Sequence, residues 1–318
     1  NSILELRKFH FYKINSNYEG INPVKKILLS IVSFFKIFIL IFRVEKVYVS
    51  FKRSRIMMIV QLIFFYLFKF LNKKIILHLH GSEYLFYKTT FEKKLFKANL
   101  AFSSVLIVLH ESFARDLKEY TKDIRVIENF SELTLKEKKQ STKINFTFLS
   151  NLIKDKGILE LVAAFNNLQA KYKDIYLNIY GKDIDGLEDQ ILGKNINYYG
   201  EITNLEAKKT CLEVCDVLCL PTYYKTEAFP ISIIEGIMMK CHIITTDFNY
   251  LYDIFKDDQV EFVPPKSVKK LQESMESYIL NREKISSDIE KKYSESSSRY
   301  SKSTFLSKIN KVLIDKMS

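Results

Sequence analysis

The chain contains no tryptophan, five histidines and only four cysteines among its 318 residues. Four cysteines in a chain of this length do not make a disulfide framework. No apolar stretch with a charged start and a small-residue cleavage site opens the sequence, so we expect a cytoplasmic protein. The apolar content of 47% is enough to build true cores, and the length suits two ordinary domains or one large one.

Positive charge is concentrated in the first third of the chain. The formal net charge is +12, and residues 1–100 hold 18 Lys and Arg against 5 Asp and Glu. The remaining residues are almost balanced. The excess therefore belongs to the N-terminal part, and it indicates a basic surface there.

Two very apolar runs with basic flanks lie in this part, at residues 24–43 and 57–71. Neither predicts a transmembrane span, because about 20 uninterrupted apolar residues are needed and Lys36 and Lys69 interrupt them. They fit two buried helices packed on a sheet. They fit equally a helix that lies on an anionic membrane, where each Lys or Arg contributes about 1 kcal/mol. Nucleic acid ranks last, because no recognisable binding motif is present.

Short apolar strands alternate with helical patterns, which predicts βα units and parallel sheets. Residues 131–143, largely charged or hydroxylic, separate two such series and indicate a linker. We therefore expect two α/β domains: 1–138, and 144–290 followed by a C-terminal segment, 291–318, that crosses back as a polar loop and an amphipathic helix. The expected strands are 46–51, 74–80, 104–110 and 123–129 in the first series, and 144–150, 175–181, 196–201, 216–222 and 242–247 in the second.

The segment "TEAFPISIIEG" (226–236) places Glu227 and Glu235 around an apolar helix start. Pro230 is favoured at a first helical position, which predicts that a helix begins here. The backbone amides on either side of it, those of Phe229, Ile231 and Ser232, would then bind phosphate at the positive end of the helix dipole. The two carboxylates would accept hydrogen bonds from sugar or ribose hydroxyls. Taken alone, the segment favours a Glu227 that caps the helix and a Glu235 that lies on the surface over a ligand site.

This segment resembles the E-x7-E motif of the family-4 glycosyltransferases, which are retaining enzymes of GT-B fold. Further segments are similar to that family in the right order: "LHLHGSE" (77–83), "VLHESFARDL" with "RVIENF", "FTFLSNLIKDKGILELVAAF" (146–165) and the stretch from "YYGEITN" to "CHIITTD". The resemblance implies two Rossmann-like α/β domains facing across a cleft, with the nucleotide sugar bound by the C-terminal one.

The resemblance also implies roles for individual residues. Lys156 would balance the charge of the leaving nucleoside diphosphate, Glu235 would hold the ribose hydroxyls, and Glu227 those of the donor sugar. Backbone amides between Phe229 and Ser232 would contact the phosphates. His80 would touch the transferred sugar, although His78 and His80 share one strand face and either could be an ordinary structural histidine.

The sequence departs from the family pattern at two places. Ser150-Asn151 stands where the family commonly has Gly-Arg, so Asn151 replaces one of two diphosphate cations, and Lys154 is the candidate substitute. A first strand with a glycine-rich turn is missing as well, so we expect the chain to be truncated at its N-terminus.

Two patterns imitate metal sites. Asp183 and Asp185 form a D-x-D, but they follow "LNIYG" in a loop that is similar to the family's nucleobase-side turn, and we expect a solvated turn. Cys211, Cys215 and Cys219 fall four residues apart without accompanying histidines, so we expect buried cysteines. No metal and no cofactor are expected beyond the nucleotide-sugar co-substrate.

The predicted function is retaining, metal-independent transfer of a sugar to a lipid-linked saccharide at the inner face of a bacterial membrane, in surface polysaccharide or lipopolysaccharide assembly. Two alternatives share the fold. A GT-B epimerase or phosphorylase would need no glycosyl acceptor, and a non-catalytic nucleotide-sugar-binding module would bind the donor without turning it over.

Overall fold

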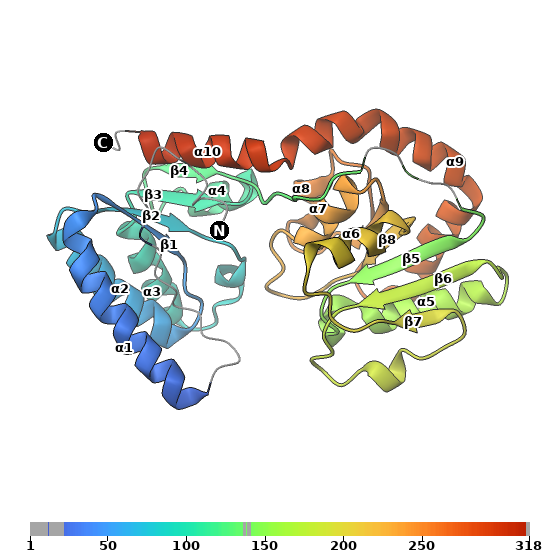
Figure 1. Ribbon diagram of the computed structural model, residues 1–318, viewed down its shortest axis with the longest axis horizontal. Coiled ribbons are helices and arrows are strands. Elements are labelled where there is room, and N and C mark those ends of the chain that lie inside the picture. Colours follow the sequence, from blue (N-terminus) through green and yellow to red (C-terminus); the bar gives the residue numbers. More distant parts are fainter. Residues whose placement is uncertain (1–11, 13–21, 136–137, 139–140, 316–318) are drawn as a thin grey trace. The chain divides into compact units, whose positions relative to one another are not determined.

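The computed structural model describes residues 12, 22–135, 138 and 141–315. The chain forms two compact units, shown in Figure 1. The first consists of the described residues up to His80, of Tyr87–Ile127 and of those from Leu306 onward. The second consists of Gly81–Phe86 and Glu128–Phe305. Each unit has its own parallel sheet.

The first unit is built on a four-stranded sheet in the order β1-β2-β3-β4, with all neighbours parallel. Its central strands are continuous apolar runs and are buried along their length, as parallel strands covered on both faces are. The four strands agree with those predicted from the sequence. They are β1 (Lys46–Ser50), β2 (Lys74–His78), β3 (Val105–Val108) and β4 (Ile124–Val126).

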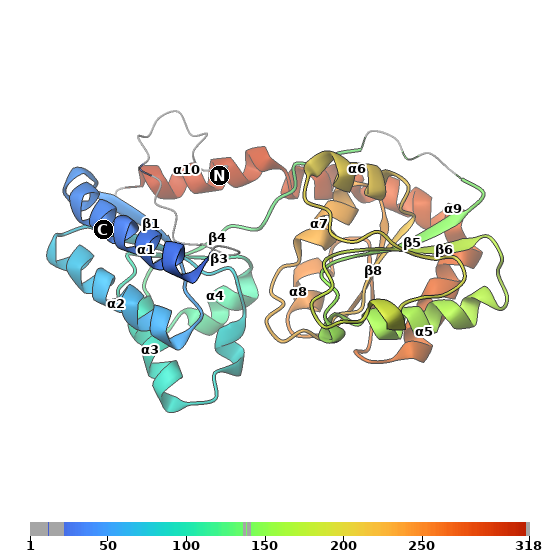
Figure 2. The same ribbon diagram turned by 60° about the horizontal axis from the view of Figure 1, so that its bottom comes forward.

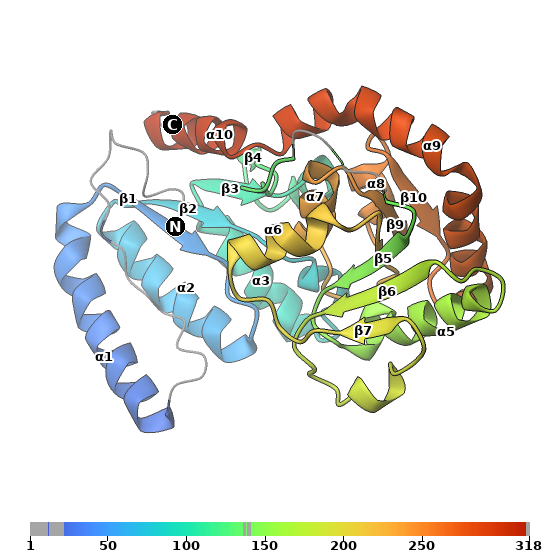
Figure 3. The same ribbon diagram turned by 45° about the vertical axis from the view of Figure 1, so that its right-hand side comes forward.

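Helices α1 and α2 lie side by side next to this sheet (Figure 3). The expectation of two buried helices is wrong in part, because α2 buries only one stripe, made by Met58, Gln61, Phe65 and Phe68. Large apolar side chains on its other faces, and in the last turns of α1, are exposed. Within the described residues, no helix combines the length and apolar character needed to cross a bilayer. The helical elements are α1 (Pro23–Leu40), η2 (Ile41–Arg43), α2 (Arg55–Phe70), α3 (Thr90–Ala101) and α4 (Glu111–Leu117).

The second unit is built on a six-stranded parallel sheet in the order β10-β9-β8-β5-β6-β7. The chain runs outward from β5 to β7, then returns to the other side of β5 with β8. The strand order therefore reverses between β5 and β8, and ligands of open α/β sheets bind at such a switch point, beyond the carboxyl ends of the strands. The strands are β5 (Ile144–Leu149), β6 (Ile175–Tyr180), β7 (Ile196–Tyr198), β8 (Val217–Leu220), β9 (His242–Thr246) and β10 (Val260–Val263).

Helices cover both faces of this sheet, with α5 on one side of β5 and β6 and with α6 and α7 on the other (Figure 2). Phe146, Phe148 and Phe165 are fully buried between β5 and α5. The predicted helices near 157–172, 204–214 and 230 are present, whereas β10 was not predicted. The elements are η4 (Lys154–Lys156), α5 (Ile158–Gln169), η5 (Glu188–Gln190), α6 (Leu205–Glu213), α7 (Ile231–Met238), α8 (Leu251–Phe255), α9 (Val268–Arg299) and α10 (Lys302–Ile314).

The polar segment expected to link the domains packs against the second unit. Asn129 donates to the carbonyl of Phe229, and Ser131 donates its N–H to the carbonyl of Tyr300. The Lys138 ammonium donates to the carbonyls of Leu212 and Met239, at the ends of α6 and α7. The units accordingly divide at Ile127 and Glu128, before this segment.

The C-terminal region is almost entirely helical. The polar stretch expected as a loop near 297–301 continues α9 as far as Arg299, so that expectation is wrong. Arg299 bridges the carboxylates of Glu128 and Asp258 at 2.8 and 3.4 Å, which holds the end of the helix in the second unit. From Leu306 onward α10 belongs to the first unit, where Ile309, Val312 and Leu313 are buried.

Candidate functional site

The switch point of the second sheet brings together Lys156 and Glu227. Lys156 follows β5 and Glu227 follows β8, and the Nζ of the lysine forms an ion pair with Oε2 of the glutamate. The two side chains are 13% and 11% exposed. A largely buried pair of this kind is costly to form without additional partners, so it marks a site where charge is needed.

A tight turn positions Lys156. Residues Lys154–Lys156 form a single 3₁₀ turn, and Gly157 ends it with φ of +77°. A Cβ at position 157 would lie only 2.1 Å from the carbonyl oxygen of Pro221. Glycine is therefore required here twice over, for its left-handed backbone and for the close approach of the loop after β8.

Three other groups contact Glu227 or its partner Lys156. The hydroxyl of Thr222 lies 3.4 Å from Oε2, and the ring of Tyr224 lies 5.0 Å from the Lys156 ammonium. The hydroxyl of the fully buried Ser82 donates to the backbone carbonyl of Glu227 at 3.0 Å. Ser82 and Glu227 both belong to the second unit, so this hydrogen bond ties Gly81–Phe86 to the E-x7-E segment within that unit.

Helix α7 starts beside this ion pair. Pro230 occupies the N-cap position and Ile231 is the first helical residue, one position later than predicted. The amides of Ile231 and Ser232 belong to the first helical turn, whose N–H groups have no acceptor within the helix. The ring of Phe229 packs in the core against Phe255 at 5.3 Å, so only its backbone is available to a ligand. The arrangement suits an anion.

Glu235 lies on α7, just past its first turn. It is buried, and Lys208 of α6 contacts its Oε1 at 2.8 Å. Burial raises the pKa of Glu235, while the hydrogen bond and charge of Lys208 oppose that shift. A buried carboxylate held by one lysine retains lone pairs with which to accept hydroxyl donors.

The loop after β6 closes another side of the site. The side-chain oxygen of Asn151 accepts from the N–H of Lys182 at 3.4 Å, which ties the two loops together. Asp183 accepts from the backbone amides of Leu187 and Glu188, and these bonds lower the pKa of its carboxyl. Asp185 accepts from the N–H of Lys154. Both carboxylates of the D-x-D therefore stabilise turns.

His80 lies just beyond β2 in the first unit. Its ring stacks on that of His78 with centroids 3.8 Å apart, so the two share one face as predicted. His80 as a whole is exposed, but desolvation by the protein atoms packed near its ring, together with the positive charge of Arg53, lowers its pKa to about 4, so the imidazole is neutral at pH 7. His78 is fully buried and contacts the hydroxyl of Tyr48 through Nδ1, which identifies it as the structural member of the pair.

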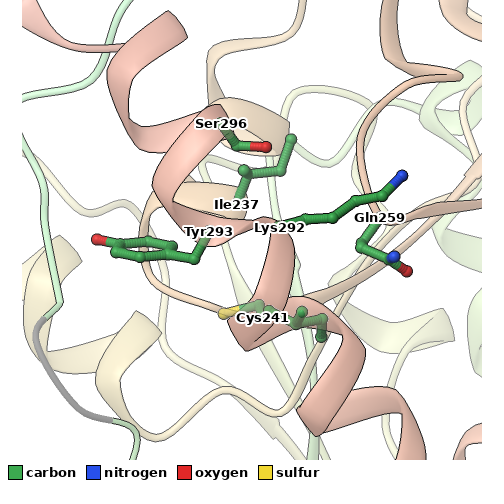
Figure 4. Close-up of a pocket in the computed structure, with 7 residues that line it drawn as sticks. Ile237, Cys241, Gln259, Lys292, Tyr293 and Ser296 are labelled. Carbon is green, nitrogen blue, oxygen red and sulfur yellow. The ribbon is translucent and has the colours of Figure 1, made fainter.

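The cysteines are buried and free, as predicted for Cys211, Cys215 and Cys219. Among the described residues, no three His, Cys, Asp or Glu side chains are placed to hold a metal ion. A small hollow between α7 and α9 is shown in Figure 4. Its volume of about 10 Å³ has room for roughly one water molecule. It is too small for a nucleotide, and it is lined by Ile237, Cys241, Gln259, Ile289, Lys292, Tyr293 and Ser296.

Sequence reasoning missed three residues of the site: Ser82, Lys208 and Thr222. Ser82 stands inside a quoted motif, but its partner is a backbone carbonyl 145 positions away. Lys208 is one of two adjacent lysines on α6, and nothing in the sequence marks which of them faces α7. Thr222 was placed at the end of the predicted strand 216–222. In the structure it lies two residues beyond β8, in the loop of the site, and its place at the carboxyl end of a strand was the usable signal.

The geometry agrees with a comparison against protein families. The family described as Glycosyl transferases group 1 matches residues 129–295, more than half of the chain. The chain belongs to this family. The match runs from the segment before β5 to the last turns of α9, and it includes every residue of the switch-point site except Ser82.

Individual relatives of this group 1 glycosyltransferase are distant. It is 24% identical over 222 residues to the glycosyltransferase TuaC of Bacillus subtilis, named for teichuronic acid biosynthesis. That match covers 64% of this chain and 54% of TuaC, so the chain spans about half the length of this relative.

Solved structures share the fold. Sucrose-phosphate synthase from Thermosynechococcus elongatus is similar with a TM-score of 0.74 and 13% identity, over 95% of this chain and 82% of that one. HepE of Anabaena, solved with UDP and glucose, is similar with a TM-score of 0.70 and 14% identity, over 89% of this chain and 81% of that one. The predicted GT-B fold class, with two Rossmann-like sheets, is confirmed.

Proposed function

We propose that this group 1 glycosyltransferase transfers a sugar from a nucleotide donor to a saccharide acceptor with retention at the anomeric carbon. The ion pair between Lys156 and Glu227 at the switch point carries the proposal. It places a cation and a carboxylate beside the amides that open α7. A sugar nucleotide needs the same set of groups: positive charge for its diphosphate and an acceptor for its hydroxyls.

Each residue has a defined part in the proposed reaction. The diphosphate binds to the amides of Ile231 and Ser232 and to the ammonium of Lys156, which leaves Glu227 free to accept from the donor sugar. The bond between the anomeric carbon and the phosphate oxygen breaks, and the acceptor hydroxyl forms a new bond on the same face. Its proton passes to the leaving phosphate. Lys156 stabilises the charge that develops on that phosphate.

His80 takes part as a neutral imidazole. With a pKa of about 4 it carries no charge at pH 7, so it can donate or accept one hydrogen bond to a sugar hydroxyl without opposing the developing positive charge on the ring. The proposed reaction uses no metal and no resident cofactor, because lysine ammonium groups and backbone amides bind the diphosphate and balance its charge. Lys154, exposed on the same turn as Lys156, is the candidate second cation.

Nucleotide titration tests the donor site. The melting temperature of the protein is expected to rise with one of the nucleotides UDP, GDP and ADP, because a ligand that binds only to the native state stabilises it. Glu235→Ala is expected to weaken binding of that nucleotide at least tenfold, because the loss of a charged hydrogen-bond acceptor costs about 1.5–3 kcal/mol of binding free energy. Unchanged affinity in this variant would remove Glu235 from the site.

Two other functions remain open to a decisive assay. An epimerase or phosphorylase would convert a nucleotide sugar or sugar phosphate without any glycosyl acceptor. A binding module would bind the nucleotide and never release it from a sugar. Acceptor-dependent release of nucleoside diphosphate from a sugar nucleotide supports transfer and contradicts both.

The proposal extends to an acceptor carried on a lipid at an anionic membrane surface, as in assembly of surface polysaccharide or lipopolysaccharide. The exposed faces of α1, η2 and α2 combine large apolar side chains with Lys36, Arg43 and Lys69, all exposed. Apolar groups that enter the headgroup region beside lysine and arginine make an interfacial surface. The exposed apolar residues include Phe35, Ile39, Phe42, Ile63, Tyr66 and Phe70.

Vesicle binding tests this surface. The protein is expected to sediment with vesicles that contain phosphatidylglycerol and to be released by raised salt, since screening weakens attraction to the surface. The double variant F42S/F70S is expected to lose most of this binding. Leu192→Ser, which replaces an exposed apolar residue of the second unit, is the matched control. Equal binding to neutral vesicles, or by the double variant, would contradict membrane docking.

A further inference from the structure

Glu235 and Lys208 form an ion pair that joins two helices at the donor site. The carboxylate is 6% exposed, and the Lys208 Nζ lies 2.8 Å from its Oε1. Lys208 stands in the first turns of α6, four residues after the N-cap Asn204, and its side chain is 28% exposed. The lysine therefore reaches inward from the rim of the unit to a buried acid.

Among the described residues, the other titratable group that interacts with Glu235 is Cys211. On α6, Cys211 is one turn beyond Lys208 and buried. Burial, together with the nearby Cys241 and Glu235, raises the pKa of Cys211 to about 12, so this thiol stays neutral and adds no charge. Among the residues that the structure describes, Lys208 is the cation that contacts Glu235.

The state of Glu235 depends on this contact. Burial alone raises the pKa of Glu235, and Lys208 works against that shift. A buried carboxyl without a cation tends to take up a proton, because the low-dielectric surroundings disfavour its charge. A protonated carboxyl carries a donor of its own and accepts less readily from the two hydroxyls of a ribose.

We infer that Lys208 is a positioning residue, which keeps Glu235 an ionised acceptor for the ribose hydroxyls and so removes the titration of Glu235 from the pH dependence of nucleotide affinity near neutrality. The inference rests on the proposed function, since it assumes that Glu235 binds the ribose. Lys208 acts through Glu235 and does not itself contact the diphosphate.

Isothermal titration of the full chain tests the inference. UDP, GDP and ADP are titrated into wild type, and the tightest of them is the probe; inorganic pyrophosphate, which lacks a ribose, is the second. Lys208→Met is expected to bind the nucleotide about tenfold more weakly near pH 6, because a raised pKa leaves Glu235 protonated there. Since the ionised fraction grows with pH, the affinity should return toward wild type near pH 8.5.

Matched variants separate the possible outcomes. Lys208→Arg should restore the wild-type pH profile. Lys209→Met should resemble wild type, because the side chain of Lys209 is 42% exposed and pairs with Glu213 at 3.8 Å. Pyrophosphate affinity should be the same in Lys208→Met as in wild type. Weaker pyrophosphate binding would mean that Lys208 contacts phosphate directly and would overturn the inference.

The inference and the proposed function fail in different ways. If Glu235→Ala weakens the nucleotide but Lys208→Met binds like wild type at every pH, Lys208 has no positioning role and the donor site stands. If neither variant changes nucleotide affinity, Glu235 lies outside the donor site and both ideas are wrong. Circular dichroism of each variant shows that the loss is not one of folding.

Discussion

Replacing Lys156 with methionine is expected to lower kcat/KM for sugar transfer by about 10²–10³-fold, the usual effect of removing one group that stabilises transition-state charge. In the absence of donor, the ammonium is paired with Glu227 and only 13% exposed. A diphosphate that enters the site takes over this cation. The charge on its leaving oxygen grows as the glycosidic bond breaks, so the lysine stabilises the transition state more than the bound donor.

This difference predicts how the loss divides between kcat and KM. Most of it should fall on kcat, because an interaction that strengthens in the transition state contributes to turnover. Initial rates of nucleoside diphosphate release, measured over a range of donor concentrations, give both parameters. A loss confined to KM would show that Lys156 only binds the ground state.

Methionine keeps the length and packing of the lysine stem, so the substitution removes the charge with little change in volume. It also leaves Glu227 as a buried carboxylate without its cation, which weakens the site in the empty state. Lys182→Met, at an exposed position on the neighbouring loop, is the control and should retain wild-type rates. Lys154→Met tests whether Lys154 is the second cation of the site. A tenfold loss of kcat/KM in this variant would indicate that Lys154 contacts the diphosphate.

Local patterns fixed much of the fold in advance. Strands β2, β3, β5 and β8 are short apolar runs between polar segments, and their ends agree with prediction to within one or two residues. The resemblance implied that Lys156, Glu227 and Glu235 share one site. The structure pairs Lys156 with Glu227 beyond the ends of β5 and β8, whereas Glu235 lies within α7 and pairs with Lys208. Parallel topology alone brings the ends of β5 and β8 together.

The remaining features depend on distant contacts. The end of α9 is polar and rich in serine, which predicts a loop, but Ser296, Arg299 and Tyr300 all bond to the buried Asp258. Tertiary hydrogen bonds therefore stabilise a helix that the local sequence disfavours. Lys208 was missed for a similar reason, because its partner Glu235 is on another helix.

The exposed surfaces of α1 and α2 show what apolar composition alone cannot predict. The apolar runs at 24–43 and 57–71 fitted burial and a membrane surface equally. In the structure α2 has more apolar faces than its neighbours cover, and Phe70 is 83% exposed. The composition of a segment shows that its side chains are apolar, but not whether protein, water or lipid surrounds them. The charged flanks are the second observation, and together with the exposed apolar side chains they motivate the proposal of a membrane-binding surface.

Gly157→Ala is expected to destabilise the second unit by about 3 kcal/mol or more, from left-handed backbone strain together with overpacking. The new Cβ would lie 2.1 Å from the Pro221 carbonyl oxygen, a backbone atom that cannot rotate away as a side chain can. Either the turn that holds Lys156 or the loop after β8 must move. Transfer activity should fall together with stability, because both loops belong to the site.

Gly186→Ala separates the two contributions. Gly186 has a similar φ of +68°, but a Cβ there would meet nothing within 4 Å. This variant introduces the backbone strain alone, so its free energy of unfolding should fall by about 1–2 kcal/mol. The difference between the two variants therefore measures the close approach of Pro221.

Urea unfolding followed by far-ultraviolet circular dichroism is the suitable measurement, because the chain lacks tryptophan. Two units can give two transitions, and the bound nucleotide identifies the second unit by shifting only that transition. The midpoint of this transition should fall much further in Gly157→Ala than in Gly186→Ala. Equal midpoints would mean that the loop after β8 yields freely, and that Gly157 serves the turn at Lys156 through its backbone angle alone.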